Sequence, residues 1–175
     1  MGQRQIGLAT GVLVFSAMIL PVGCSQLTQY DITINDRIVY EPAPPLPLDG
    51  IADPALEGCL RQTLMDAQIS EPGALEQLNC SNAGIESLEG LEQFDGIRSL
   101  KLSGNKIRNL LALERLKALR QLWLDNNNVV DPIPVLRMTS LRQLDLTNNP
   151  GLQCPSPDRI PSSMQLTLPD HCNPT

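Results

Sequence analysis

Aromatic side chains are scarce in this sequence of 175 residues: Phe, Tyr and Trp together make up 3%, although 42% of the residues are hydrophobic. A folded core must therefore consist mainly of aliphatic side chains, with leucine foremost. Positive charge is also limited, because 13 Lys and Arg face 19 Asp and Glu, for a formal net charge of −6. Binding to nucleic acid requires a basic surface that contacts the phosphates, so this balance argues against a nucleic-acid partner.

Sequence signatures of catalysis and of metal binding are absent as well. The only histidine, His171, has no nucleophile and no metal-ligand spacing around it. The sequence contains no GxSxG, HExxH, Walker-type or Cys-x-x-Cys motif. Asp125 and the three asparagines after it resemble a calcium-binding loop, but the carboxylates are too few for such a site. We therefore predict a protein that is not an enzyme and that needs no metal or cofactor.

The first 23 residues have the features of an export signal. Arg4 is the only charged residue before the apolar run Ile6–Leu20. At 15 residues, this run is shorter than the roughly 20 that a membrane-spanning helix needs. We therefore predict that residues 1–23 are a signal peptide and that residues 24–50 form a tether.

The end of this signal resembles the lipobox of bacterial lipoproteins. Gly23, a small residue, stands directly before Cys24, and the resemblance implies that Cys24 is acylated and becomes the first residue of the mature protein. Ser25 is not the Asp that this family uses for inner-membrane retention, which implies the outer membrane, with either the periplasmic or the surface face. Pro21 replaces the usual aliphatic residue three places before the cysteine, so ordinary cleavage nearby and a retained anchor are alternatives.

The tether contains one segment with strand-like alternation. Residues Tyr30–Ile34 alternate apolar and polar side chains, and Asn35-Asp36 is predicted to turn the chain into a second strand at 37–40. The Pro-rich residues 41–48 follow, where each proline fixes φ and removes a backbone donor. We expect a semi-rigid spacer there, with a ligand for a proline-binding domain as the alternative.

Residues 51–74 are predicted to contain a helix that caps the next segment. Asp53 is a favourable N-cap residue, and Pro54 is tolerated at the first helical position. Apolar residues then recur at spacings of three and four, which gives the helix one buried stripe. The stripe consists of Leu56, Cys59, Leu60 and Leu64.

Residues 75–153 consist of 22-residue repeats. The clearest copy is Ile97–Ala118, and further copies begin at Leu75, Leu119 and Leu141, with apolar residues at the first, fourth and sixth places. A fixed period of roughly 20–29 residues is typical of a leucine-rich-repeat solenoid. We therefore predict an α/β solenoid: a short leucine-rich-repeat arc of four repeats plus an edge strand, with a parallel concave sheet and a cap at each end.

The ninth place of the three later repeats holds a polar residue that should point inward: Asn105, Asn127 and Asn149. We expect these asparagines to form a ladder that hydrogen-bonds backbone groups otherwise buried unpaired. On the convex side, apolar residues spaced by three predict 3₁₀ turns or short helices in the first two repeats. Pro132 and Pro134 predict instead an extended or 3₁₀ connection in the third repeat.

Cysteine arithmetic supports export. With Cys24 assigned to the lipid, four cysteines remain, an even number that can pair in an oxidising compartment. Cys59 lies on the apolar stripe of the cap helix, and Cys80 occupies the inward sixth place of the first repeat. A Cys59–Cys80 disulfide would close a loop of about 20 residues, which contributes about 3 kcal/mol in the chain-entropy account.

The C-terminal cap is predicted to span residues 154–175. Leu166 and Leu168 are still in phase with the repeats and predict a fifth, edge strand. A disulfide between Cys154 and Cys172 would hold that strand in place. Both ends of the solenoid would then be closed covalently, as suits a small core.

The repeats resemble the 22-residue type of bacterial internalins, whose core is LxxLxLxxNxI. IRSLKLSGNKI, starting at Ile97, and LRQLWLDNNNV, starting at Leu119, each differ from it at one place. The order of segments, from lipobox to tether to Cys-capped repeats, resembles leucine-rich-repeat lipoproteins of Gram-negative bacteria. This resemblance implies a binding module without chemistry of its own.

The third and fifth places of each repeat should form the concave face, because strand side chains alternate. These places hold Gln77 and Asn79, Ser99 and Lys101, Gln121 and Trp123, Gln143 and Asp145, and Gln165 and Thr167. Trp123 is the one large apolar group among them, and an outward indole ringed by polar groups is typical of a binding hot spot. The alternative is that Trp123 packs on Lys101 and serves stability alone.

The second places add a column of arginines: Arg98, Arg120 and Arg142. Such a column could receive carboxylate or phosphate groups, or it could be a solvated rim paired with local acids. We predict a monomeric cell-envelope module, anchored in the membrane by its lipid, that binds an unidentified protein partner through the concave face. The alternatives are a structural envelope scaffold, or glycan or lipopolysaccharide binding through the arginine column.

Overall fold

The computed structural model describes residues 32–34, 37–40 and 46–172. The chain divides into two compact units, Met1–Pro42 and Ala43–Thr175. In the first unit, strands β1 (Ile32–Ile34) and β2 (Arg37–Tyr40) pair antiparallel, as the alternation predicted. The predicted signal peptide, Cys24, the turn and the first prolines of the spacer lie outside the described residues. None of the helices in the described part is long and apolar enough to cross a membrane.

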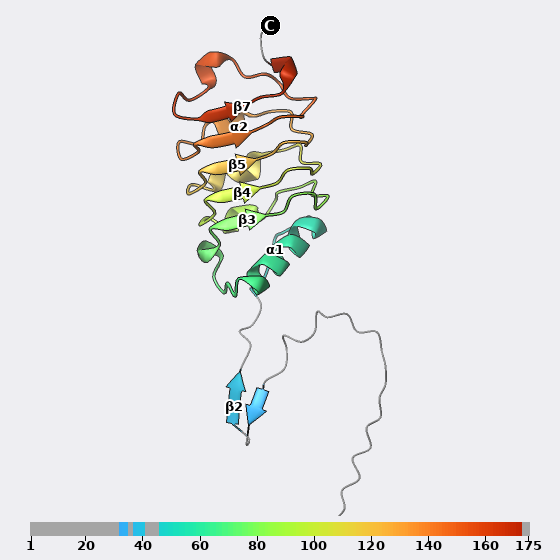
Figure 1. The fold of residues 1–175 in the computed structure, drawn as a ribbon, viewed down its shortest axis with the longest axis vertical. Coiled ribbons are helices and arrows are strands. Elements are labelled where there is room, and N and C mark those ends of the chain that lie inside the picture. The colour runs from blue at the N-terminus through green and yellow to red at the C-terminus, as the bar shows by residue number, and fades with distance from the viewer. Residues whose placement is uncertain (1–31, 35–36, 41–45, 173–175) are drawn as a thin grey trace, which may run out of the picture. The chain divides into compact units, whose positions relative to one another are not determined.

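The second unit is a short leucine-rich-repeat arc, so the predicted fold class is confirmed. Five strands form one parallel sheet in the order β3-β4-β5-β6-β7 (Figure 1). They are β3 (Gln77–Asn79), β4 (Ser99–Lys101), β5 (Gln121–Trp123), β6 (Gln143–Asp145) and β7 (Gln165–Thr167). The register advances by one repeat per strand, so that Leu100 of β4 pairs with Leu78 on one side and with Leu122 on the other. Equivalent places of all repeats therefore lie side by side.

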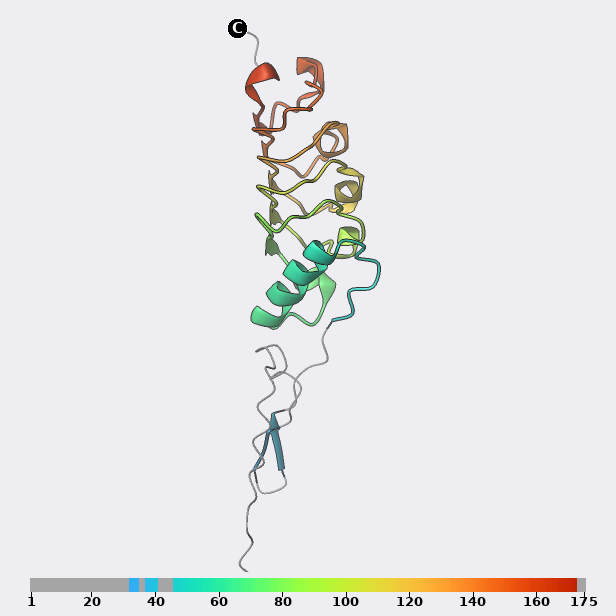
Figure 2. The same ribbon diagram turned by 90° about the vertical axis from the view of Figure 1, so that its right-hand side faces the viewer.

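The convex side of the arc is built from short helical turns, which Figure 2 shows opposite the strands. The 3₁₀ turns η3 (Leu91–Gln93) and η4 (Leu111–Arg115) occur where the spacing by three predicted them. In the third repeat the prediction was wrong, because a single α-helical turn, α2, spans Ile133–Leu136. Pro132 precedes this turn as its N-cap and Pro134 lies within its first turn, where a backbone N–H has no intrahelical partner.

Aliphatic side chains from the strands and from the convex turns fill the space between them. The first-, fourth- and sixth-place residues of the two central repeats are fully buried: Ile97, Leu100, Leu102, Leu119, Leu122 and Leu124. Phe94 is the one buried Phe of this core. Leu46 and Leu48, which the sequence placed in the tether, also pack against the core. The core thus continues into the segment just before the N-terminal cap.

The N-terminal cap is helix α1 (Pro54–Asp66), which covers the open edge of β3, and a 3₁₀ turn, η2 (Pro72–Ala74), follows it (Figure 1). Leu56, Leu60 and Leu64 of the apolar stripe are buried. The disulfide between Cys59 and Cys80 joins α1 to the end of β3, with 5.9 Å between the Cα atoms. The predicted pairing is therefore present.

Asp53 fixes this cap by a second contact that the sequence did not suggest. One carboxylate oxygen accepts hydrogen bonds from the backbone N–H groups of Ala55 and Leu56, at 2.9 and 3.1 Å. The other oxygen accepts from Glu86 and Ser87 of the first repeat, at 2.8 and 3.0 Å. Burial alone would raise the pKa of Asp53, but these four donors stabilise the carboxylate, so the pKa is lowered from its ordinary 3.8.

The ninth-place asparagines are buried and hydrogen-bond the backbone of two neighbouring repeats. The amide nitrogen of Asn127 donates to the carbonyl oxygens of Leu102 and Leu124, at 2.9 and 3.0 Å. Its amide oxygen accepts from the N–H of Ile107 at 3.0 Å. Asn105 and Asn149 make equivalent bonds. Within the described residues, no buried side-chain nitrogen or oxygen lacks a partner.

The eighth place of each repeat has a positive φ, which turns the chain away from the strand. Asn82, Gly104, Asn126 and Asn148 occupy it, with φ of 57°, 70°, 56° and 53°. Glycine and asparagine adopt this left-handed conformation more readily than other residues. The repeated Asn-Asn pair thus combines a turn residue at the eighth place with a buried backbone partner at the ninth.

The C-terminal cap consists of the 3₁₀ turn η5 (Pro157–Arg159), the edge strand β7 and the 3₁₀ turn η6 (Asp170–Cys172). Leu166 and Leu168 are half-buried, as expected for an edge strand. The second predicted disulfide is present between Cys154 and Cys172, with 5.3 Å between the Cα atoms. Both ends of the arc are therefore closed by a disulfide.

Candidate functional site

The concave face is formed by the third- and fifth-place side chains of the five strands. Because the strands are in register, these side chains form two columns that run across the sheet. The third-place column is almost entirely glutamine, and Gln121 donates to Gln143 at 3.3 Å. The third-place column is therefore polar and uncharged. The backbone pairing of the strands fixes the positions of its side chains.

Trp123 lies in the fifth-place column between Lys101 and Asp145. The amino group of Lys101 sits 5.2 Å from the centre of the indole ring, a cation–π distance. Trp123 is consequently half-buried, and Lys101 is exposed. The ring packs on Lys101, and a portion of it remains accessible on the face, so its role as a binding hot spot stays a prediction.

Asp145, on the other side of Trp123, is engaged with its own turn. One carboxylate oxygen accepts the backbone N–H of Thr147 at 3.0 Å and also the Thr147 hydroxyl. In the turn after β5, Asp125 accepts in a similar way from the hydroxyl of Ser103 at 2.5 Å. These carboxylates therefore have structural partners, and Trp123 is the side chain of this column with the most apolar surface to offer.

The arginine column lies along the edge where the strands begin. Arg98, Arg120 and Arg142 surround a hollow of about 290 Å³ together with Lys117, Ala118 and Ser140. Lys117 is a residue that the strand pattern did not reveal, because it stands at the end of the second repeat, before the strand of the third. The period gave a signal for part of this lining: Ala118 and Ser140 are equivalent places, each directly before a first-place leucine and two residues before a second-place arginine.

Two of these arginines already have partners. The side chain of Arg98 pairs with Glu76 at 3.4 Å, which is the neighbour one repeat back. Arg142 donates to the carbonyl oxygens of Thr139 and Leu141, at 2.7 and 3.0 Å. Within residues 46–172, no carboxylate lies within 4 Å of Arg120, Arg142 or Lys117. The arginine column therefore lines a cationic hollow, and its side chains do not form a continuous row of ion pairs.

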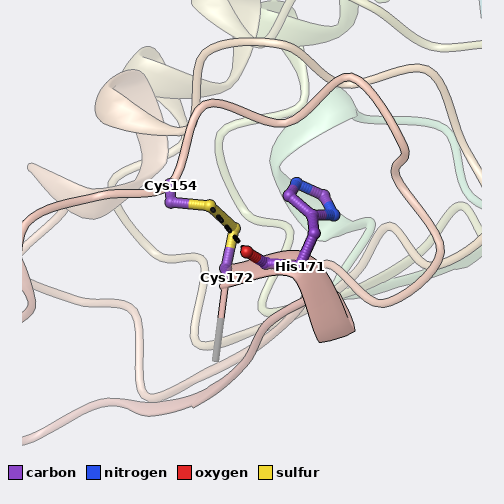
Figure 3. Close-up of side chains that lie close together, drawn as sticks. All are labelled: Cys154, His171 and Cys172. Carbon is purple, nitrogen blue, oxygen red and sulfur yellow. Dashed lines mark hydrogen bonds between the residues drawn. A yellow bond between two sulfur atoms is a disulfide. The ribbon is translucent and has the colours of Figure 1, made fainter. Parts of the chain in front are cut away.

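The C-terminal cap brings Cys154, His171 and Cys172 together, as Figure 3 shows. Their possible ligand atoms lie within 4.8 Å of one another. The two sulfur atoms are bonded to each other, however, so neither is a free thiolate that could bind a metal. The ring nitrogen Nε2 of His171 lies 3.0 Å from the carbonyl oxygen of Leu152, which ties the last turn to the fourth repeat. This cluster therefore has a structural explanation.

Comparison with known proteins identifies the fold and nothing finer. No protein-family model matches this sequence, and no curated protein matches it either. Among solved structures, internalin C2 of Listeria monocytogenes is similar, with a TM-score of 0.60 and 23% identity, over 71% of this chain and 57% of that one. The functional domain of InlJ from the same organism has a TM-score of 0.46 and 26% identity, over 55% of this chain and 20% of that one.

The structural similarity to internalin C2 establishes an internalin-like leucine-rich-repeat fold. Five parallel strands in one sheet, with 3₁₀ turns on the other side, are the shared architecture. The chain spans little more than half the length of internalin C2. The similarity to internalin C2 therefore shows the fold of this chain and does not show what the chain binds.

Proposed function

We propose that this chain is an exported envelope protein whose concave face binds a protein partner. The observation that carries the proposal is Trp123, which presents an apolar ring on a rigid, otherwise polar sheet. Lys101 holds the ring in place, so little side-chain freedom is lost on binding. Tryptophan is among the residue types that are enriched at the binding hot spots of protein interfaces.

Export and anchoring form the second part of the proposal. Two disulfides in a domain of this size suit an oxidising compartment. Acylation at Cys24, in keeping with the lipobox resemblance, would attach the domain to the outer membrane through the tether. Replacing Cys24 with serine should move the protein from the membrane fraction to the soluble fraction, and an unchanged distribution would refute the lipid anchor.

A pull-down from crosslinked, intact envelopes tests the binding face. Trp123→Ala should lose the captured partner, whereas Leu111→Ala should retain it. Leu111 is a suitable control because it is a large apolar side chain, 59% exposed, on the convex turn η4. Capture that survives Trp123→Ala but is lost in Leu111→Ala would reject the concave face and favour the scaffold alternative.

We further propose that the domain acts as a monomer and without an enzymatic step of its own. The disulfides and the two caps close both ends of the solenoid, which removes the open sheet edges through which copies would otherwise stack. The mass of the protein in native solution tests the first statement. A mass of two or more chains at micromolar concentration would refute it.

A further inference from the structure

The cationic hollow at the strand-entry edge is a feature that binding through Trp123 does not use. It is lined by four positive side chains: Arg98, Lys117, Arg120 and Arg142. All four are exposed. Like charges held this close repel one another, by an amount that solvent reduces but does not remove. Only Arg98 of the four has a carboxylate partner within residues 46–172, so most of this positive charge is not balanced in the free domain, which favours an anionic occupant.

The charge of the domain is strongly divided along the arc. Residues 46–97 contain ten Asp and Glu against one Arg, whereas residues 98–142 contain nine Lys and Arg against three Asp and Glu. The chain as a whole is acidic, with a net charge of −6. The basic character is therefore confined to the second and third repeats and the first two residues of the fourth, and the hollow lies within this stretch.

We infer that this hollow is the docking site for a short acidic peptide segment of the protein partner. The inference rests on the proposed function in one respect, that the occupant belongs to a protein. Arg120 stands directly before β5, the strand that carries Trp123, so one partner lying across the sheet reaches both. The glutamine column between them can hydrogen-bond the same partner's backbone.

The spacing of the arginines fits carboxylates on an extended chain. Neighbouring strands lie about 4.8 Å apart, so the three guanidinium groups span about 10 Å, or three residues of extended peptide at about 3.3 Å each. A guanidinium presents a planar fork that matches a carboxylate in a bidentate arrangement. Arg120, which has no carboxylate partner in the described domain, is the group best placed to make the first such pair.

The charge division favours a short segment over an extended anionic surface. A membrane or a lipopolysaccharide layer that covered the hollow would also approach the acidic residues of the cap and the first repeat. Salt screens this repulsion only partly wherever an anionic group comes within about 8 Å of an acidic residue, because about 8 Å is the Debye length at physiological salt. An acidic segment of a few residues avoids that repulsion.

Calorimetric titration of the chain with synthetic peptides tests the inference. The exported chain carrying Cys24→Ser is titrated with (Glu-Ser)₄ and with (Gln-Ser)₄ as the neutral control. Vesicles containing phosphatidylglycerol are added in a separate arm, against vesicles of phosphatidylcholine alone. The variant Arg120→Gln/Arg142→Gln removes two charges from the hollow and is called the groove variant. It is compared with the control variant Arg108→Gln/Arg115→Gln, which removes the same charge from exposed positions outside the hollow.

We expect the acidic peptide to bind and the neutral peptide not to bind. The groove variant should bind the acidic peptide about tenfold more weakly, whereas the control variant changes affinity less than about threefold. Raising the salt to 1 M should abolish binding, because the Debye length falls to about 3 Å. The melting temperatures of both variants should match the parent, and if the groove variant unfolds, Lys117→Gln replaces it.

Three results would overturn the inference. They are equal binding of the two peptides, equal affinity in the groove and control variants, and binding of phosphatidylglycerol vesicles that the groove variant abolishes. The last result would assign the hollow to an anionic surface. Trp123→Ala should leave the peptide titration within about twofold, so loss of partner capture in Trp123→Ala with an inactive hollow rejects this inference alone. Normal capture by Trp123→Ala with an active hollow rejects the binding face alone.

Discussion

Replacing Asp53 with alanine removes a carboxylate that holds the N-terminal cap to the first repeat. The substitution deletes the N-cap of α1, which is worth about 1 kcal/mol. It also leaves the backbone N–H groups of Glu86 and Ser87 without their acceptor, at about 1 kcal/mol each. The free energy of unfolding should therefore fall by about 3 kcal/mol, which lowers the melting temperature by about 10 °C for a domain of this size.

Asp131→Ala is the matched control. Its carboxylate also lies at the start of a helical turn, next to the N-cap Pro132, but it accepts a single backbone N–H, from Ile133 at 2.9 Å. Chemical denaturation of the two variants, followed by far-ultraviolet circular dichroism, should give a loss of about 1 kcal/mol for Asp131→Ala. Equal losses in the two variants would refute the account of Asp53 as a clamp between the cap and the repeats.

The pH dependence of the same variant provides a second readout. The pKa of Asp53 is lowered in the folded protein, so the carboxylate contributes stability that is fully present above the ordinary pKa of 3.8. That contribution is lost as the pH falls below 3.8 through the folded-state pKa. The difference in unfolding free energy between the parent and Asp53→Ala should therefore shrink below about pH 4. A difference that grows on acidification would have the wrong sign.

Three further substitutions test the rest of the arc. Asn127→Leu should lower the free energy of unfolding by about 3–5 kcal/mol, because buried carbonyl oxygens lose their donor, while the exposed Asn128→Leu should change it by less than about 0.5 kcal/mol. Cys59→Ser/Cys80→Ser should cost about 3 kcal/mol, and intact mass should show four hydrogens added to the parent on reduction, with any other number contradicting two disulfides. Lys101→Met should shift the emission of Trp123 and cost about 0.5–1 kcal/mol, and an unchanged spectrum would place the amino group away from the ring.

Most of the fold could be predicted from the 22-residue period of the sequence. Because each repeat adds one strand in register, the apolar places of Ile97–Ala118 were enough to predict the sheet, its parallel order and the inward direction of Asn105. The Cys59–Cys80 disulfide followed from the same phase, since Cys80 falls on an inward place next to the cap. The Cys154–Cys172 disulfide followed instead from the two cysteines that remained in the C-terminal cap. In a stack of like units, local pattern and tertiary contact coincide.

Contacts that break the period were not predictable in the same way. The second contact of Asp53 joins residues 33 and 34 positions apart, and nothing in the capping motif indicates it. The helical turn α2 tolerates Pro134 because this residue falls within the first turn, and the sequence does not reveal where that turn begins. Lys117 joins the arginine column only through the way the chain enters β5.

The sequence predicted which residues form the candidate site but not the positions of their side chains. Strand alternation placed Trp123 on the concave face, but its half-burial depends on the side-chain conformation of Lys101. The second-place arginines were recognisable as a column, whereas the hollow between them depends on residues of the preceding turn. Side-chain positions on a surface are set by few contacts, so sequence pattern constrains them weakly.

Site-specific photo-crosslinking in intact envelopes tests whether a protein partner binds the concave face. A photoreactive residue is placed at Gln121, on the concave face beside Trp123, and in a second protein at Leu111, on the convex face. We expect a crosslinked protein partner from position 121 and none from position 111. Crosslinking from position 111 alone would contradict a concave binding face.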